Sequence, residues 1–185
     1  TAMSTLLITH PCFVLHETGR GHPERADRMR ALDKAFSHEA FSNLLREEAP
    51  LREDFEQAVV RAHPQAFYDA IFAAKPDPVI GHTVSLDSDT VLSPGSWDAV
   101  LRAVGAGLHA VDRVMADDDP VRNAFCQVRP PGHHAESDKA MGFCVFNNIA
   151  VAALYARETY GLERVAVVDF DVHHGNGTQD IFWQD

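Results

Sequence analysis

Cysteine is scarce in this sequence, and its few copies lie far apart. The 185 residues contain three cysteines, Cys12, Cys126 and Cys144, and no Cys-x-x-Cys pair. A disulfide framework or a thiolate zinc knuckle needs closely spaced cysteines, so neither is indicated. A reducing, cytoplasmic setting is the expectation that fits this cysteine usage.

Long apolar runs and positive charge are also lacking. No stretch reaches the about 18 consecutive apolar residues of a membrane helix, and the N-terminus does not resemble a signal peptide. Sixteen Lys and Arg against 27 Asp and Glu give a formal net charge of -11, which disfavours partners such as nucleic acid or an anionic membrane. An acidic protein can still attract a basic substrate.

The composition that is present is that of one soluble globular domain, with 45% hydrophobic and 23% charged residues. Thr1 and Ala2 precede Met3 and look like a cloning scar. The unusual feature is the histidine content: four of the eleven histidines form the adjacent pairs His133-His134 and His173-His174. We therefore expect the chemistry at these two pairs.

Apolar periodicity predicts strands that alternate with helices. Short apolar runs predict strands over residues 6–9, 124–128 and 164–170, and the last is the near-continuous run typical of a buried parallel strand. Apolar residues at three- and four-residue steps predict helices over residues 24–36, 39–47, 64–75, 94–115 and 147–160. Residues 76–95 are rich in Pro, Gly, Asp and Ser and are expected to form an ordered loop. This order favours an α/β fold with a mostly parallel sheet.

Metal-ligand residue types follow the strongest predicted strand. If the strand continued to residue 173, Asp169, Asp171 and His173 would lie on one side of it, because strand side chains alternate. They would stand at the carboxyl end of the strand, where open α/β sheets place their sites. Carboxylate and imidazole ligands suit zinc, with iron and manganese as alternatives. An isolated Asp-x-His could equally cap a loop, but buried carboxylates are costly unless paired or metal-bound, which favours the metal.

The other pair, His133-His134, follows a predicted strand and a Pro-Pro-Gly turn that would fix both rings. Two histidines beside a metal-bound water could take its proton and protonate a leaving amine. The second nitrogen of each ring would need a partner, and Asp169 and Asn176 are the candidates. Without the second cluster, a surface histidine pair would be the simpler interpretation.

Three motifs in this order resemble those of the zinc-dependent histone deacetylase family. They are Arg-Pro-Pro-Gly-His-His at residues 129–134, Met-Gly-Phe-Cys-Val-Phe-Asn-Asn at 141–148, and Val-Asp-Phe-Asp-Val-His-His-Gly-Asn-Gly-Thr-Gln at 168–179. The resemblance extends from Leu6 to the last residue, and class II and bacterial members share the asparagine at position 176. It implies the three-layer fold of the arginase and deacetylase proteins, present here only in part.

The resemblance also implies roles for individual residues. Asp171 and His173 would be zinc ligands, His134 the general base and acid, and His133 its electrostatic helper, with Asp169 and Asn176 as the orienting partners. The substrate would be contacted along the acyl channel by Phe143 and Gly142, at the rim by Asp87 and at the foot of the site by Arg28. A potassium site on Asp169, Asp171 and His173 is implied as well. The structural alternatives to substrate contact are a helix-surface role for Arg28 and an Asx turn for Asp87.

By the same resemblance, residues 3–185 are the N-terminal half of one deacetylase domain. The third zinc ligand and the oxyanion tyrosine of the family would lie beyond residue 185. The strand at 164–170 would then be at or near an edge with unpaired backbone groups, so we expect association between copies or instability.

The expected activity is zinc-dependent removal of acetyl groups from lysine side chains or similar amines. An acetylpolyamine amidohydrolase is a close variant, and a truncated, non-catalytic acyl-lysine binding module is the alternative of a different class. A two-manganese hydrolase of the arginase type would have the order Asp-x-His-x-Asp. Residues 169–173 instead read Asp-x-Asp-x-His, which argues against that class.

Overall fold

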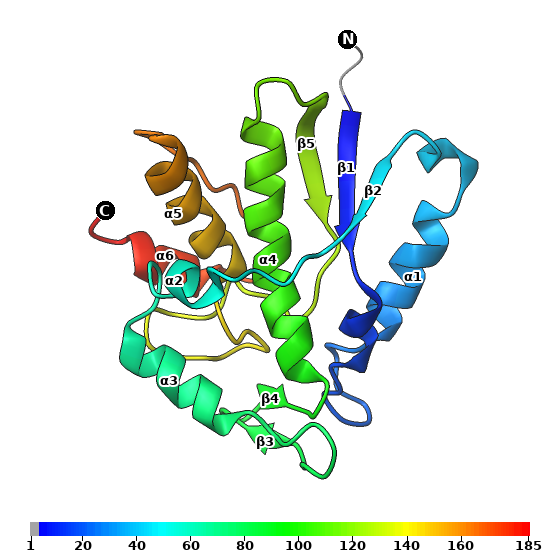
Figure 1. Cartoon of the computed structure of the whole chain (residues 1–185). Helices are drawn as coiled ribbons and strands as arrows, with labels where there is room; N and C mark the ends of the chain where they lie inside the picture. The colour runs from blue at the N-terminus through cyan, green and yellow to red at the C-terminus, as the bar shows by residue number, and fades with distance from the viewer. Residues whose placement is uncertain (1–3) are drawn as a thin grey trace.

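A parallel sheet forms the centre of the fold (Figure 1). The structure is a computed structural model that describes residues 4–185. Strand β1 (Ser4–Thr9) lies between β2 (Leu45–Glu48) and β5 (Val121–Cys126), and both neighbours pair with it in parallel. The α/β class with a parallel sheet is confirmed.

Successive apolar side chains of β1 point to opposite faces of the sheet, so helices can pack on both faces. Leu6 and Ile8 pack against α4 (Ser96–Met115), which contributes Ala99, Ala103 and Ala106 to the same buried cluster. Leu7 alternates with them and lines a hollow beside Phe36 of α1 (Asp27–Phe36). A short 3-10 helix, η1 (Pro11–Leu15), follows β1 directly.

A second core lies on the other flank of α4. There α4 packs against α5 (Asn148–Tyr160), and α2 (Phe55–Val59) and α3 (Gln65–Ala74) close the cluster with aromatic side chains. Phe146 sits at its centre and contacts Phe55, Phe67 and Tyr68. This core supports the loop of residues 127–147, which carries one of the histidine pairs.

Helices over 64–75, 94–115 and 147–160 are confirmed within a few residues by α3, α4 and α5. The helix expected over 24–36 begins later, at Asp27, and the strand expected over 124–128 is β5, three residues earlier at its start. The loop over 76–95 contains a small antiparallel hairpin of β3 (Val84–Ser85) and β4 (Val91–Leu92).

Two predicted elements are wrong. Residues 39–47 are not a helix: a 3-10 turn, η2 (Glu39–Phe41), precedes strand β2, which is held by β1 through the register Leu6 to Leu45. Residues 164–170 form no strand, because no other strand of the described chain pairs with them. Their apolar side chains are largely in solvent, with Val168 82% and Phe170 96% exposed.

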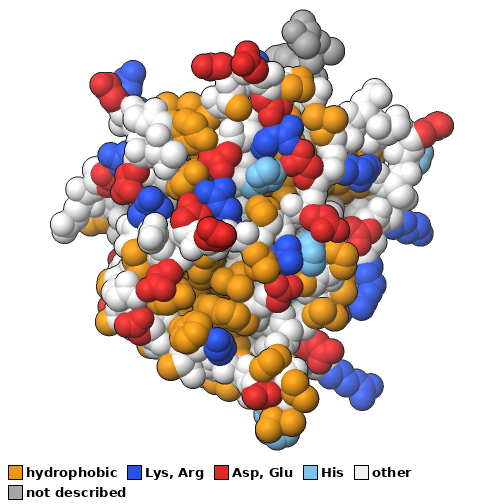
Figure 2. Space-filling model, viewed as in Figure 1, with side chains coloured by type: hydrophobic (Ala, Val, Ile, Leu, Met, Phe, Trp, Pro, Cys, Tyr) orange, Lys and Arg blue, Asp and Glu red, His pale blue; other side chains and the backbone are white. Residues whose placement is uncertain are grey.

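On the face seen in Figure 2, acidic and basic side chains are interspersed. Apolar side chains on the same face gather over α3 and the neighbouring part of α4. The three cysteines carry free thiols. Within residues 4–185, no helix is long and apolar enough to cross a membrane.

Candidate functional site

The loop that carries His133 and His134 is anchored by a buried ion pair. Arg129 is fully buried and donates two hydrogen bonds to Glu24, Nε to Oε1 at 2.6 Å and Nη2 to Oε2 at 2.7 Å, and a third to the carbonyl of Phe13 at 2.6 Å. Gly132 lies so close to Asn148 that an added Cβ would stand 2.6 Å from its backbone nitrogen. The histidine pair therefore starts from a backbone with little freedom.

Each histidine of this pair has a polar partner on Nδ1. His133 Nδ1 lies 2.8 Å from Oδ2 of Asp169, and His134 Nδ1 lies 2.6 Å from Oδ1 of Asn176. The two ring centroids are 4.1 Å apart. The structure thus brings together the four residues that the sequence analysis assigns to proton transfer; the catalytic role of each stays a prediction.

The hydrogen bonds of Asn176 determine which nitrogen of His134 carries the proton. Its amide nitrogen donates to Oε1 of Glu136 at 2.9 Å, so its oxygen is the atom that faces His134. An acceptor at Nδ1 places the ring proton there and leaves the lone pair on Nε2. The neutral ring is therefore prepared to accept a proton at Nε2.

Backbone contacts hold helix α6 (Asn176–Phe182) against the histidine pair. The amides of Gly177 and Thr178 both donate to the carbonyl of His133, at 3.0 and 3.2 Å. Asn176 is the first residue of this helix, so the docking of α6 also fixes the partner of His134.

Asp171 and His173 lie side by side, but not through strand alternation as the sequence analysis expects. Residues 171–173 bend: the amide of Asp171 donates to Oδ1 of Asp169 at 3.1 Å, and the amide of His173 donates to Oδ1 of Asp171 at 2.8 Å. The side chains of Asp171 and His173 are 51% and 73% exposed, and the His173 ring centroid is 5.9 Å from that of His134. The side chains of Asp171 and His173 therefore come together because the backbone bends, and not because they alternate along a strand.

Hydrogen bonding lowers the pKa of both aspartates below the usual range. For Asp169 the first cause is the His133 ring, and for Asp171 it is the backbone amide of His173. Both groups are therefore carboxylates at neutral pH, as metal binding or orientation of a histidine requires.

The donor pair fits part of a zinc site. Oδ1 of Asp171 and Nδ1 of His173 are 3.1 Å apart. Two ligand atoms on a tetrahedral zinc would be about 3.3 Å apart, from bonds of about 2.0 to 2.1 Å. Within residues 4–185, no third His, Cys, Asp or Glu completes a compact donor group with this pair.

Gly142 lies next to the His134 ring, and both Gly142 and Phe143 have a left-handed backbone conformation. Their φ angles are 57° and 70°, which is rare for phenylalanine. A Cβ on Gly142 would stand 2.6 to 2.7 Å from His134 side-chain atoms, so no other residue fits there. The amide of Phe143 donates to Thr90 Oγ1 at 3.0 Å, and its ring meets the edge of His22 at 4.7 Å between centroids.

Asp87 and Arg28 have structural partners of their own. Oδ1 of Asp87 accepts the amides of Asp89 at 2.9 Å and Thr90 at 2.7 Å, which is the Asx turn considered above. Arg28 donates to the carbonyl of Val128 at 2.8 Å. Their contact with substrate stays a prediction.

Four residues that support this site are not predicted from the sequence: Glu24, Arg129, His22 and Thr90. Arg129 belongs to a quoted motif, so its side chain could have been suspected. Its partner Glu24 lies 105 residues away in sequence, and no local pattern indicates that separation.

Comparison with known proteins identifies the family. The family model described as Histone deacetylase domain matches residues 22–185, so the chain belongs to this family. An uncharacterized protein of Synechocystis is 41% identical over 169 residues, covering 90% of this chain and 53% of the relative. A histone deacetylase-like amidohydrolase of Pseudomonas aeruginosa is 41% identical over 165 residues, covering 89% of this chain and 41% of the relative.

Solved structures agree. The crystal structure of the HDA15 HD domain superimposes with a TM-score of 0.87 at 35% identity, covering all of this chain and 52% of that one. The chain therefore spans about half the length of the relatives that it matches.

Proposed function

We propose that the protein containing this chain is a zinc-dependent amidohydrolase that removes acetyl groups from lysine side chains or similar amines. The observation that carries the proposal is the His134–Asn176 hydrogen bond beside the Asp171–His173 donor pair. A histidine with its Nε2 lone pair free next to a metal donor pair is what hydrolysis of an amide by water requires.

Asp171 and His173 would hold the zinc. When bound, zinc polarises the acyl carbonyl and makes a water molecule acidic enough to act as nucleophile. Nε2 of His134 accepts the proton of the attacking water and delivers it to the leaving amine nitrogen. His133, hydrogen-bonded to the Asp169 carboxylate, would assist electrostatically next to the developing oxyanion.

The acyl chain would lie along Phe143 and Gly142, which contact His22 and His134. Asp87 at the rim and Arg28 at the foot complete the proposed substrate contacts. A potassium ion on Asp169, Asp171 and His173 belongs to the same proposal.

The test uses the longest natural form of the protein, an acetyl-lysine peptide and a zinc assay on the same samples. His134→Ala should abolish turnover and leave the zinc content unchanged, whereas Asp171→Ala should lose both. The exposed His82 provides the control: His82→Ala should keep full activity. Turnover that survives His134→Ala would refute the assigned role.

Acetylated polyamines are a second candidate substrate. A relative named polyamine deacetylase HDAC10, of Danio rerio, is 40% identical over 139 residues, covering 74% of this chain and 20% of the relative. The net charge of -11 suits a cationic substrate. The ratio of kcat/KM for an acetylpolyamine to that for an acetyl-lysine peptide separates the two.

A non-catalytic acyl-lysine binding module is the remaining alternative, favoured by the absence of a third donor near Asp171 and His173 in the described chain. Binding of an acetyl-lysine peptide without turnover in the longest natural form would support it.

A further inference from the structure

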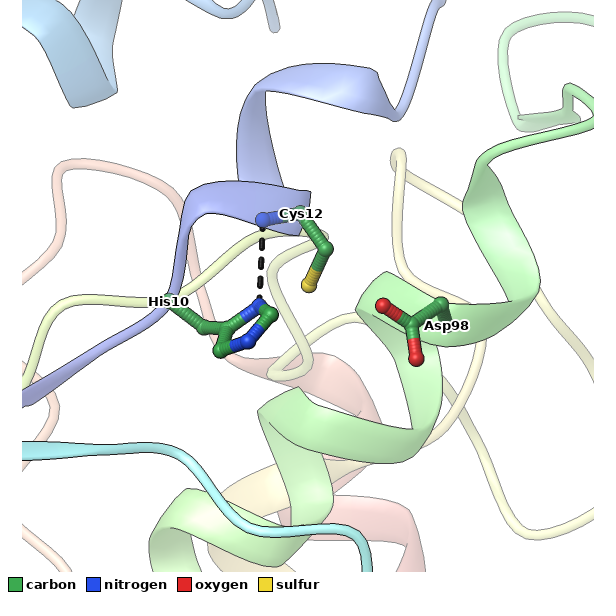
Figure 3. A group of neighbouring side chains, drawn as sticks. All are labelled: His10, Cys12 and Asp98. Atoms are coloured by element: carbon green, nitrogen blue, oxygen red, sulfur yellow. Dashed lines mark hydrogen bonds between the residues drawn. The ribbon is translucent and has the colours of Figure 1, made fainter.

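Three side chains with metal-binding atoms meet at the junction of β1, η1 and α4. His10 is the N-cap residue of η1, Cys12 lies in its first turn, and Asp98 lies in the first turn of α4 (Figure 3). One nitrogen, one sulfur and one oxygen from these residues all lie within 4.8 Å of one another. Among residues 4–185 this is the only such group of three, and it shares no residue with the Asp171–His173 pair.

The hydrogen bonds of His10 leave one ring nitrogen unprotonated. Nδ1 accepts the amide of Cys12 at 3.1 Å, so in the neutral ring the proton is on Nε2. Nε2 lies 3.9 Å from a carboxylate oxygen of Glu48 at the end of β2. Histidines that bind a metal through one nitrogen usually direct the other N–H toward such a carboxylate.

The Cys12 thiol is buried next to the Asp98 carboxylate. The Cys12 side chain is only 4% exposed, and its sulfur lies within 4.8 Å of an Asp98 carboxylate oxygen. A cation that enters between sulfur and oxygen takes the place of the thiol proton and offsets the repulsion between thiolate and carboxylate.

The charges around the cluster match a divalent ion. With the thiol ionised, Cys12, Asp98 and Glu48 carry three negative charges, and Arg102, 3.4 Å from Asp98, carries one positive charge. The remaining two negative charges balance one divalent cation. Thiolate and imidazole ligands select zinc-class ions over magnesium and calcium, which prefer oxygen.

We propose that His10 Nδ1, Cys12 Sγ and the Asp98 carboxylate form a second metal site, which binds a zinc-class divalent cation. Binding exchanges the Cys12 N–H contact of Nδ1 for a metal bond and releases the thiol proton to solvent. Water supplies the fourth position of a tetrahedral site. The bound ion joins the carboxyl end of β1 to the start of α4.

Cobalt(II) is the probe, because a thiolate ligand gives it a sulfur-to-metal charge-transfer band in the near ultraviolet and ligands without sulfur do not. The metal-free chain titrated with Co²⁺ should develop this band, and Zn²⁺ should abolish it. Cys12→Ser should remove the band, and Asp98→Asn should weaken Co²⁺ binding at least tenfold. Cys126→Ser, which changes a cysteine outside the cluster, should leave the band unchanged.

Two further measurements keep the result interpretable. Asp171→Ala should retain the band, so this site is tested independently of the proposed deacetylase centre. Zn²⁺ should raise the Tm of the Asp171→Ala chain but not that of a Cys12→Ser, Asp171→Ala double variant, with circular dichroism to verify folding. No band in the wild-type chain, or a band that survives Cys12→Ser, would overturn the proposal.

Discussion

Nδ1 of His134 and Oδ1 of Asn176 are 2.6 Å apart, and the amide nitrogen of the same asparagine donates to Glu136. The asparagine is therefore held from both sides, and its orientation determines the tautomer of the histidine.

Asn176→Ala should reduce kcat about 10- to 100-fold with little change in KM, because it removes the group that orients the base and not a substrate contact. Nitrogen-15 NMR of the 185-residue chain gives a second readout: Nδ1 of His134 should be the protonated nitrogen in the wild type and exchange with Nε2 in the variant. Gln179→Ala, at an exposed position of the same helix, is the control and should change neither. An unchanged tautomer in Asn176→Ala would contradict the assignment.

Gly142→Ala should destabilise the chain more than Gly161→Ala. Both glycines have positive φ, 57° and 65°, so each variant loses about 1 to 2 kcal/mol to backbone strain. A Cβ at Gly142 also collides with His134, whereas a Cβ at Gly161 meets nothing within 4 Å. Overpacking should add about 1 to 3 kcal/mol for Gly142→Ala. Urea unfolding of the two variants measures the difference, and equal losses would show that the His134 ring moves freely.

Stability should fall as the pH drops from about 6.5 toward 4, because of His16. Burial lowers the pKa of His16 to about 4, although the Glu24 carboxylate opposes the shift. An unfolded histidine has a pKa of about 6.5, so in this window the unfolded chain binds more protons than the folded one. The free energy of unfolding then decreases by up to about 1.4 kcal/mol per pH unit as pH falls.

Denaturant unfolding at several pH values checks this slope. His16→Gln should be less pH-dependent than the wild type, and His82→Gln, at an exposed position, should match the wild type. Burial lowers the pKa of His63 as well, so the flattening in His16→Gln should be partial. A slope in His16→Gln identical to the wild type would count against the buried neutral imidazole.

The chain should associate through the segment 164–172. Val168, Phe170 and Val172 are 82%, 96% and 93% exposed, which is costly for adjacent apolar side chains in water. Sedimentation should show concentration-dependent association that Phe170→Lys reduces. Val79, 87% exposed in a separate loop, supplies the control Val79→Lys, which should not reduce it. A dispersed wild-type monomer at high concentration would disprove the expectation.

Local sequence patterns predict the elements whose residues follow a periodicity of their own. The stripe of Val100, Val104 and Leu108 defines α4 without reference to other residues. The sequence does not predict strand β2, because Leu-Arg-Glu-Glu is compatible with a helix and only pairing with β1 selects the strand. The segment 164–170 has the composition of a strand, but a strand also requires a partner.

For the candidate site, too, groups that are close in sequence are predictable, whereas contacts between distant segments are not. Motifs that are compact in sequence predict the histidine pair and the donor pair. The structure places the His134 and His173 ring centroids 5.9 Å apart, but through bends at residues 171–173 and not through a continued strand. The buried partner of Arg129 and the cluster of His10, Cys12 and Asp98 depend on contacts between distant segments, 105 and 86 residues apart. Such contacts arise from the complete packing of the chain.

The buried Glu24–Arg129 pair limits how this protein can be engineered. A loop with residues 127–136 grafted onto another scaffold would bring a guanidinium without its carboxylate, and an unpaired buried charge costs about 3 to 5 kcal/mol. A graft would therefore need the segment that carries Glu24 as well as the loop. If the gene were split between these segments, the two fragments would have to associate before the histidine loop could order. The histidine loop therefore depends on Glu24 and on the carbonyl of Phe13, which hold Arg129 from a distant part of the sequence.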